Sequence, residues 1–202
     1  MNIVETPIND LLIIEPKIWK DDRGYFYESF NAKKFEEAGI NLTFVQDNQS
    51  FSQKNTLRGL HAQAEPFAQG KLVRVIQGAV LDVAVDIRKN SPTYGQHFSV
   101  VLSGDNFKML WVPPGFLHGF VTLEDATIFS YKVTGFYDKD SEVGIMWNDA
   151  DLNIDWKIQP EEAILSEKDK VLGNFKNLQS PFKRLKTGKQ KRRLYSALFL
   201  FS

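Results

Sequence analysis

A histidine placed among basic residues is the first part of the sequence that could do chemistry. Residues 57–74 read LRGLHAQAEPFAQGKLVR and set His61 among Arg58, Lys71 and Arg74. An imidazole exchanges protons near neutral pH, and a nearby cation stabilises negative charge that develops during a reaction. The segment therefore indicates proton transfer beside a bound anion, unless these charges merely share the solvent face of a strand.

Metal and thiol chemistry find little support in the sequence. The chain has no cysteine, which excludes disulfides, thiolate metal ligands and a cysteine nucleophile. Pro113, Gly115 and His118 have the P-x-G-x-x-H spacing of a cupin motif, but the H-x-H pair of metal-binding cupins is absent. A site made of His61, His97 and His118 is possible, although the spacing does not support it. We expect a metal-free cupin.

Proton transfer needs a base, an acid and a partner for the developing anion. His61 is the best candidate for the base, Lys71 or Arg58 could hold an oxyanion or a phosphate, and Tyr131 is one of several tyrosines that could act as the acid. His61 and Arg58 are three residues apart, so a regular strand would point them to opposite faces. Gly59 lies between them and could support a bulge that brings them to one face.

The elements that must position these residues are mostly short strands. Strand-like segments with Gly, Asp and Asn between them recur along the chain, among them LLIIEP, GYFYESF, LTFVQDN, LRGLHAQ, KLVRVIQG, AVLDVAVDIR, HFSVVLSG, FKMLWVPPG, HGFVTL and ATIFSYKVTGFY. This rhythm predicts an all-β sandwich or barrel. NAKKFEEAG predicts a short helix that Asn31 caps and Gly39 ends, and EEAILSEKDK predicts one or two helical turns.

One segment, VLDVAVDIR, alternates cleanly between two kinds of side chain. One face carries Leu81, Val83, Val85 and Ile87, and the other carries Asp82, Ala84 and Asp86. The two acids either face solvent or line a polar, ligand-binding barrel interior.

The charge distribution separates the chain into a body and a tail. Seven of the 25 Lys and Arg residues and none of the 25 Asp and Glu residues lie after residue 182. The body is therefore acidic, which disfavours a nucleic-acid polymer as partner. We predict a single domain over residues 1–182 and a basic, then apolar, tail over residues 183–202. The tail is either an extension outside the fold or an interaction segment or weak membrane-surface anchor.

Targeting and membrane features are not evident in the sequence. The start, MNIVETPIND, lacks the basic and apolar regions of a secretory signal. No apolar run reaches the length of about 18 residues that spans a membrane. We expect a cytoplasmic protein.

Eight segments together resemble the dTDP-4-dehydrorhamnose 3,5-epimerase family of nucleotide-sugar enzymes. They are DDRGYFYESF, FVQDNQS, LRGLHAQ, QGKLVR, DVAVDIRKNSPTYGQ, LWVPPGFLHGFVTL, YKVTGFY and SEVGIMWND, and they follow the family order. The resemblance covers about residues 2–175. It departs from the family at Ala62, where an aromatic residue is common, and at Val143, where a small residue is usual.

The resemblance implies a cupin-type β-sandwich, a homodimer, and no metal or organic cofactor. It implies inversion of C3 and C5 in a dTDP-4-keto-6-deoxy sugar, with His61 as general base, Tyr131 as general acid, Lys71 beside the keto oxygen and Asp169 paired with the base. Positions that match the family's substrate contacts are Arg23, Glu28, Gln46, Asn48, Arg58, His118, Glu142 and Lys168. Arg23 and Glu28 belong to an N-terminal arm that crosses to the partner subunit in the family.

Alternatives remain within and outside enzymes. The same base and oxyanion site would serve an epimerase that inverts only C3 or only C5, or an isomerase that moves the keto group. A non-catalytic cupin that binds a nucleotide sugar would keep the arginines. It would not need His61, Lys71, Tyr131 and Asp169 together, and the presence of all four favours an enzyme.

Overall fold

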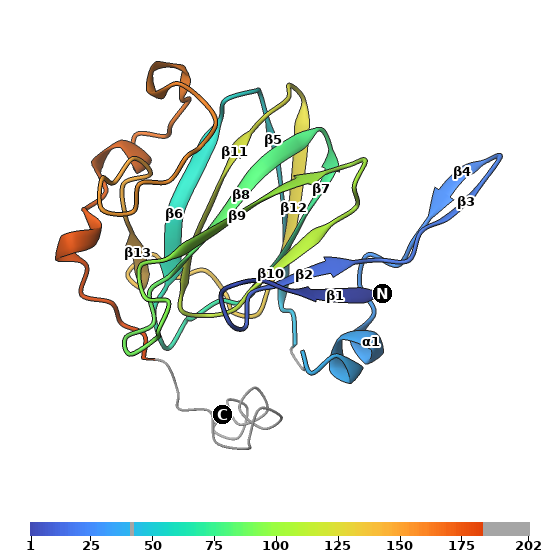
Figure 1. The fold of residues 1–202 in the computed structure, drawn as a ribbon, viewed down its shortest axis with the longest axis horizontal. Helices are drawn as coiled ribbons and strands as arrows, with labels where there is room; N and C mark the ends of the chain where they lie inside the picture. The colour runs from blue at the N-terminus through green and yellow to red at the C-terminus, as the bar shows by residue number, and fades with distance from the viewer. Residues whose placement is uncertain (41–42, 184–202) are drawn as a thin grey trace.

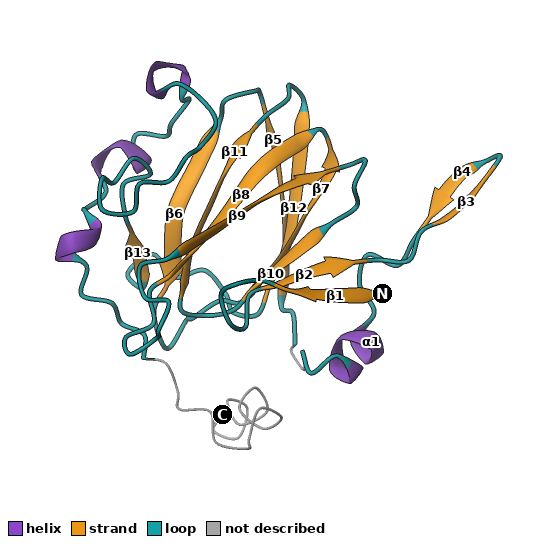
Figure 2. Cartoon of the chain, in the orientation of Figure 1, coloured by secondary structure: helices purple, strands orange, loops and turns teal. Residues whose placement is uncertain are grey.

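Two packed β-sheets form the body of the molecule (Figures 1 and 2). The computed structural model describes residues 1–40 and 43–183. The first sheet has six strands in the order β1 (Asn2–Glu5), β2 (Leu12–Glu15), β10 (Met109–Val112), β7 (Lys71–Gln77), β12 (Thr127–Val133) and β5 (Gln46–Ser52). The second has five, in the order β13 (Glu142–Gly144), β6 (Leu57–Gln63), β11 (Phe116–Thr122), β8 (Ala79–Asp86) and β9 (His97–Ser103). This antiparallel arrangement is the all-β, cupin-type sandwich that the strand rhythm and the resemblance predict.

Apolar side chains fill the space between the sheets and cover the outer face of the second sheet. Between the sheets, Val73 and Phe129 of the first sheet pack with Ala84 and Phe120 of the second. A separate cluster joins the outer face of the second sheet to the C-terminal segment, where Trp156 packs against it. Both faces of the second sheet are therefore covered, which explains why every residue of β8 is buried.

The alternation of β8 has the two faces that the sequence predicts, but its acids do not face water. Leu81, Val83 and Val85 pack under the C-terminal segment. Asp82 and Asp86 on the other side are both 0% exposed. The solvent-facing interpretation is therefore wrong, because the sandwich encloses this face and its acids are paired with internal hydrogen-bond donors.

Short helices lie at both ends of the described chain. Helix α1 (Ala32–Glu37) begins at Asn31, whose side chain accepts a hydrogen bond from the backbone N–H of Lys34. It is followed by Gly39 at φ +81°, a left-handed conformation that favours glycine. Both ends of this helix were predicted correctly. Three short 3-10 turns follow the last strand: η1 (Pro160–Glu162), η2 (Asp169–Val171) and η3 (Phe175–Asn177).

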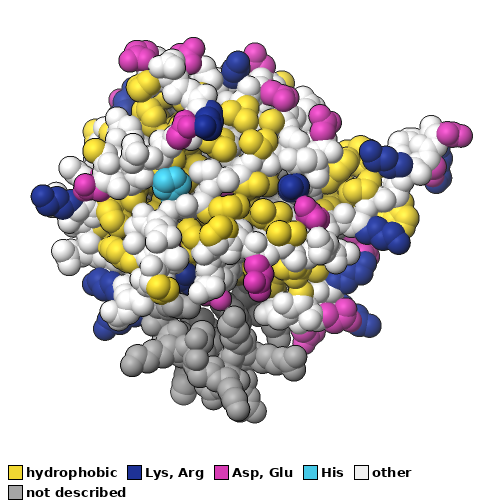
Figure 3. All heavy atoms as spheres, in the orientation of Figure 1, with side chains coloured by type: hydrophobic (Ala, Val, Ile, Leu, Met, Phe, Trp, Pro, Cys, Tyr) yellow, Lys and Arg dark blue, Asp and Glu magenta, His cyan; other side chains and the backbone are white. Residues whose placement is uncertain are grey.

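A two-stranded hairpin projects from the body, as Figure 1 shows. It consists of β3 (Trp19–Asp21) and β4 (Gly24–Phe26), with Asp22 and Arg23 at the turn. Its aromatic residues are largely open to solvent, and Phe26 is 66% exposed. On the face drawn in Figure 3, acidic and basic side chains are interspersed.

The predicted tail lies almost wholly outside the described residues. Lys183, its first residue, forms an isolated bridge with Lys89, and nothing beyond it is described. The boundary at residue 182 therefore stays a prediction, as does the cytoplasmic location. Among the described helices, none is long and apolar enough to cross a membrane.

Candidate active site

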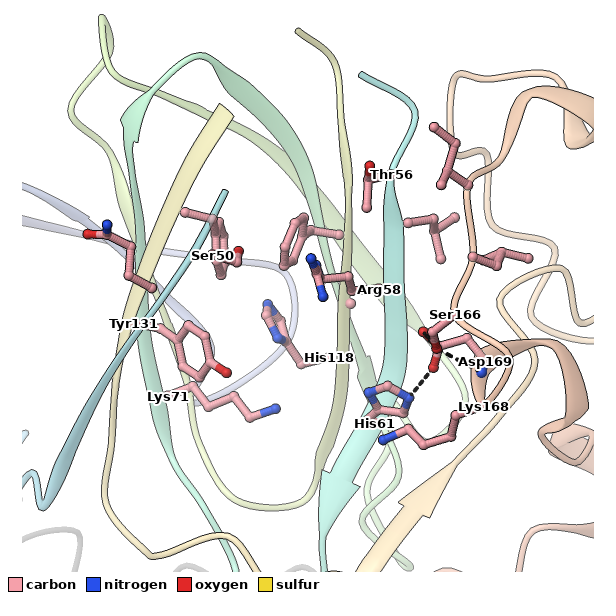
Figure 4. Close-up of a pocket in the computed structure, with 17 residues that line it drawn as sticks. Ser50, Thr56, Arg58, His61, Lys71, His118, Tyr131, Ser166, Lys168 and Asp169 are labelled. Atoms are coloured by element: carbon pink, nitrogen blue, oxygen red, sulfur yellow. Dashed lines mark hydrogen bonds and ion pairs between the residues drawn. The ribbon is translucent and has the colours of Figure 1, made fainter. Parts of the chain in front are cut away.

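A cavity of about 440 Å³ collects the side chains that the sequence singles out for chemistry. Arg58 and His61 come from β6, His118 from β11, Lys71 from β7 and Tyr131 from β12. Figure 4 shows Tyr131, Lys71 and His118 on one side and His61 on the other, with Asp169 behind His61. Both sheets and the segment around η2 thus contribute to one site.

A close hydrogen bond joins His61 to Asp169. His61 Nε2 lies 2.6 Å from Asp169 Oδ1, and Ser166 Oγ donates to Oδ2 of the same carboxylate over 2.9 Å. Burial opposes ionisation of Asp169, but the hydrogen bonds from His61 and Ser166 outweigh it and lower the pKa of the carboxyl. Asp169 is therefore an anion that accepts the Nε2 proton. This leaves the Nδ1 lone pair of His61 as the nitrogen able to take a proton.

Lys71 stands at the start of β7 with its ammonium group enclosed by the site. Burial lowers its pKa to about 8, while the negative charges of Asp82 and Glu142 oppose that shift. A lysine with this pKa remains largely charged at neutral pH. Its positive charge lies where water screens it poorly. It can therefore stabilise an oxyanion in the cavity.

Tyr131 is a protonated hydroxyl over the working pH range. Burial raises the pKa of its phenol, and the positive charge of Arg58 opposes the shift without reversing it. Its ring packs on Phe129 at a centroid distance of 5.9 Å. Tyr131 can consequently donate a proton, with its ring held by the interior of the sandwich.

An irregularity in β6 brings Arg58 and His61 to one cavity. His61 is opposite His118 on β11, whereas Arg58 is opposite Phe120, so three steps along β6 match two along β11. Gly59 lies in the extra step at φ +122°, and a Cβ there would meet Gly119 Cα at 2.5 Å. The bulge predicted at Gly59 is confirmed, and it resolves the parity problem.

A second cavity, of about 400 Å³, extends the site and shares His61, Lys71, Tyr131 and Lys168 with the first. This cavity is also lined by three expected substrate contacts, Gln46, Asn48 and Glu142. Ala62, which departs from the family pattern, lines it as well. Lys168 Nζ pairs with Glu142 Oε1 at 2.6 Å, and both side chains line this cavity. Gln46 Nε2 donates to Asn48 Oδ1 over 2.7 Å.

Two of the expected substrate contacts do not reach these cavities within the one chain. Arg23 sits on the projecting hairpin, where its guanidinium pairs with Asp21 at 2.6 Å. Glu28 pairs with Lys34 and accepts a hydrogen bond from Asn31 Nδ2 over 2.9 Å. Neither residue therefore lines the two cavities of its own chain.

The structure adds two side chains to the site whose hydrogen-bond partners were not predicted from the sequence. Asp82 accepts from His118 Nε2, and Ser166 accepts from the backbone N–H of Asp169 while donating to its carboxylate. The S-x-x-D spacing of Ser166 and Asp169 could have indicated this local pair. Among residues 1–40 and 43–183, no three His, Asp or Glu side chains cluster as metal ligands do.

Comparison with known proteins identifies the relatives of this chain. The family model described as dTDP-4-dehydrorhamnose 3,5-epimerase matches residues 5–177. The chain belongs to this family. A Shigella flexneri protein named dTDP-4-dehydrorhamnose 3,5-epimerase is 55% identical over 170 residues, which is 84% of this chain and 93% of that protein.

Solved structures agree with this family membership. A dTDP-6-deoxy-D-glucose-3,5-epimerase from Legionella pneumophila, in complex with dTDP-4-keto-L-rhamnose, is 49% identical with a TM-score of 0.87, over 92% of this chain and 99% of that one. A 3'-monoepimerase from Streptomyces bikiniensis, in complex with dTDP-quinovose, is 29% identical with a TM-score of 0.78, over 84% and 85% of the two chains. The family fold therefore carries more than one pattern of inversion.

Proposed function

We propose that this protein inverts C3 and C5 of dTDP-4-dehydro-6-deoxy-D-glucose to give dTDP-4-dehydro-L-rhamnose. One observation carries the proposal: His61, Tyr131 and the half-buried Lys71 line a single cavity. Family membership and the Legionella pneumophila relative, which is in complex with dTDP-4-keto-L-rhamnose, support the substrate class.

The base is His61, acting through Nδ1. Its other nitrogen donates to Asp169, so the pair is arranged to take a proton and to stabilise the imidazolium that results. A 4-keto group acidifies the hydrogens on C3 and C5, because either carbanion delocalises onto the keto oxygen. The remaining barrier is large, since each unit of pKa mismatch corresponds to about 1.4 kcal/mol.

Lys71 lowers this barrier by binding the C4 oxyanion. Both enolates place their negative charge on the same oxygen, so one ammonium group serves both centres. Charge develops there in the transition state, and a contact that strengthens at that point accelerates the reaction rather than only tightening binding.

Tyr131 completes the inversion from the other side of the sugar. A base that returns its own proton to the same face restores the starting configuration, whereas inversion needs a donor on the opposite face. Tyr131 keeps its proton because burial raises its pKa, and it lies across the cavity from His61 in Figure 4.

The remaining parts of the site are proposed to hold the nucleotide. Arg58 lines the first cavity beside His118 and can bind the diphosphate, while Gln46, Asn48, Glu142 and Lys168 line the adjoining one. We further propose a homodimer in which Arg23 and Glu28 act at the partner's site. Light scattering of the purified protein tests that oligomeric state.

Proton NMR of the keto sugar with the protein in deuterated water tests the reaction. Exchange at C3 and C5, together with the L-rhamno product, is the expected result. Exchange at only one centre would instead favour an epimerase that inverts a single centre. The Streptomyces bikiniensis 3'-monoepimerase is a structural relative of that kind. Binding without exchange would indicate a nucleotide-sugar-binding cupin.

Chelation tests the cofactor expectation on the same reaction. Dialysis against EDTA should leave the exchange rates unchanged within error, because proton transfer through His61, Lys71 and Tyr131 calls for no metal. Loss of turnover that one divalent ion restores would contradict the metal-free mechanism.

A further inference from the structure

A second histidine–aspartate pair lies beside the first. His118 on β11 and His61 on β6 are direct cross-strand partners, and both line the cavity. His118 Nε2 lies 2.9 and 3.0 Å from the two carboxylate oxygens of Asp82 on β8. Asp82 is 0% exposed, and so sits behind the imidazole rather than in the open cavity.

The carboxylate of Asp82 fixes how the His118 ring faces a ligand. A carboxylate only accepts hydrogen bonds, so Nε2 of His118 carries the proton directed at Asp82. The ring also stacks on Phe129, with a centroid distance of 6.3 Å and an interplanar angle of 23°. These two contacts lock the imidazole and leave Nδ1 as its nitrogen for the substrate.

The negative charge of Asp82 also favours the charged form of Lys71, which lines the same cavity as the His118 ring that Asp82 bonds. A buried carboxylate is costly unless cations compensate it, and the charge of Asp82 is the largest influence that opposes the burial-induced fall in the pKa of Lys71. The other titratable groups that share the two cavities with Lys71 are Arg58, His61, His118, Tyr131, Tyr137, Glu142, Lys168 and Asp169. Of the acids, Glu142 is already paired with Lys168 and Asp169 with His61.

We propose that Asp82 is a positioning residue of the epimerisation, which orients the His118 ring and keeps the Lys71 ammonium group charged at the keto oxygen. Asp82 touches neither the substrate nor the reacting atoms, and acts through these two side chains. The inference rests on the proposed function, because it takes the sugar keto oxygen as the partner of Lys71.

The pH profile of Asp82→Asn tests this role. The substitution keeps the shape of the side chain and removes its charge. Lys71 acts as the cation, and its pKa is about 8, so activity should fall as pH rises through that value. Without Asp82 the ammonium group loses its proton more readily, and the alkaline limb of kcat should move to lower pH by about one unit. Tyr131 does not account for this limb, because burial raises its pKa above the usual range.

Asp86→Asn is the matched control. Asp86 is on the same face of β8 and equally buried, but it pairs with Arg88 and accepts from Ser91 and Thr93. Its loss should lower the unfolding temperature and leave the alkaline limb in place. An alkaline limb in Asp82→Asn that coincides with that of the parent would overturn the proposal, as would an equal displacement in both variants.

A second variant covers the case in which Asp82→Asn does not fold. His118→Gln removes the imidazole and keeps Asp82 beside Lys71, so KM should rise while the alkaline limb stays. Movement of the limb in His118→Gln would assign it to His118 and defeat the role given to Asp82. Failure of the parent protein to exchange C3 or C5 at any pH would count against the proposed function instead.

Discussion

The interior of the sandwich and the projecting hairpin hold two parts of the expected site in opposite environments. Inside, His61 and Asp169 are joined at 2.6 Å and Asp169 is 3% exposed. On the hairpin, the side chain of Arg23 is 90% exposed and pairs only with its neighbour Asp21 among the described residues. The difference separates two tasks. In the proposed mechanism, proton transfer uses groups held in place within one chain, whereas nucleotide binding in the proposed dimer also uses residues of the partner subunit.

Loss of the base should produce the largest effect of any change in the interior. His61→Asn should reduce deuterium exchange at both C3 and C5 by about 10⁴-fold, the upper end of what a general base contributes. Exchange and product formation are followed together by NMR. His97→Asn is the matched control, because His97 lies on β9 outside both cavities. Retention of exchange at either centre in His61→Asn would show that another group abstracts that proton.

Loss of the acid should reduce net inversion much more than deuterium exchange. In Tyr131→Phe the base and the oxyanion site remain, so deuterium should still enter from the side of His61. Net inversion should fall by about 10²–10⁴-fold, because delivery from the far face is lost. Tyr94→Phe, a tyrosine that packs on Phe175, serves as control. Equal losses of exchange and inversion in Tyr131→Phe would mean that the hydroxyl positions the substrate.

Removing Arg58 from the interior should weaken substrate binding more than removing Arg23 from the hairpin. Arg58→Ala should weaken binding by roughly 1.5–3 kcal/mol through lost charge-assisted hydrogen bonds to the diphosphate. Arg23→Ala should raise KM less than Arg58→Ala does and leave kcat unchanged, since Arg23 lies outside both cavities of its own chain and has no part in the proposed proton transfer. Titration calorimetry with dTDP and with the free nucleoside measures the loss of binding, and steady-state kinetics measures KM and kcat. If Arg58→Ala discriminates between the two ligands as the parent does, Arg58 has a structural role.

Removal of the predicted tail should have the smallest effect. A chain that ends after Lys183 keeps every motif of the family and the isolated bridge between Lys183 and Lys89. Its unfolding temperature, oligomeric state and turnover should match those of the full chain. An insoluble or monomeric product would place the boundary of the domain beyond residue 183.

Local patterns account for most of what the sequence predicted. The alternation of residues 79–87 and the capped segment at residues 31–39 depend on neighbours in the chain, and both elements form as expected. The register of β6 against β11 could be predicted only by assuming a bulge at Gly59, which adds one residue to β6. The partner of the candidate base came from the family resemblance rather than from spacing, because Asp169 is 108 residues from His61.

The hydrogen-bond partner of Asp82 could not be predicted from the sequence for the same reason. Its parity on the strand showed that it shares a face with Asp86, but the two acids do different things. Asp86 pairs with Arg88, two residues along the chain, while Asp82 bonds His118 from another strand, 36 residues away. Periodicity assigns a side chain to a face and not to a partner, and only the packing of β8 against β11 decides which acid meets the histidine.

The close approach of two glycines in neighbouring strands limits how this site can be rebuilt. A Cβ on Gly59 would meet Gly119 Cα at 2.5 Å, and a Cβ on Gly119 would meet Arg58 O at 2.7 Å. Replacing either glycine therefore pushes one backbone against the other, and replacing both doubles the conflict. Grafting LRGLH onto a new scaffold would therefore also require the facing strand. The bulge at Gly59 fits only against a glycine, and that glycine lies 60 residues further along the chain.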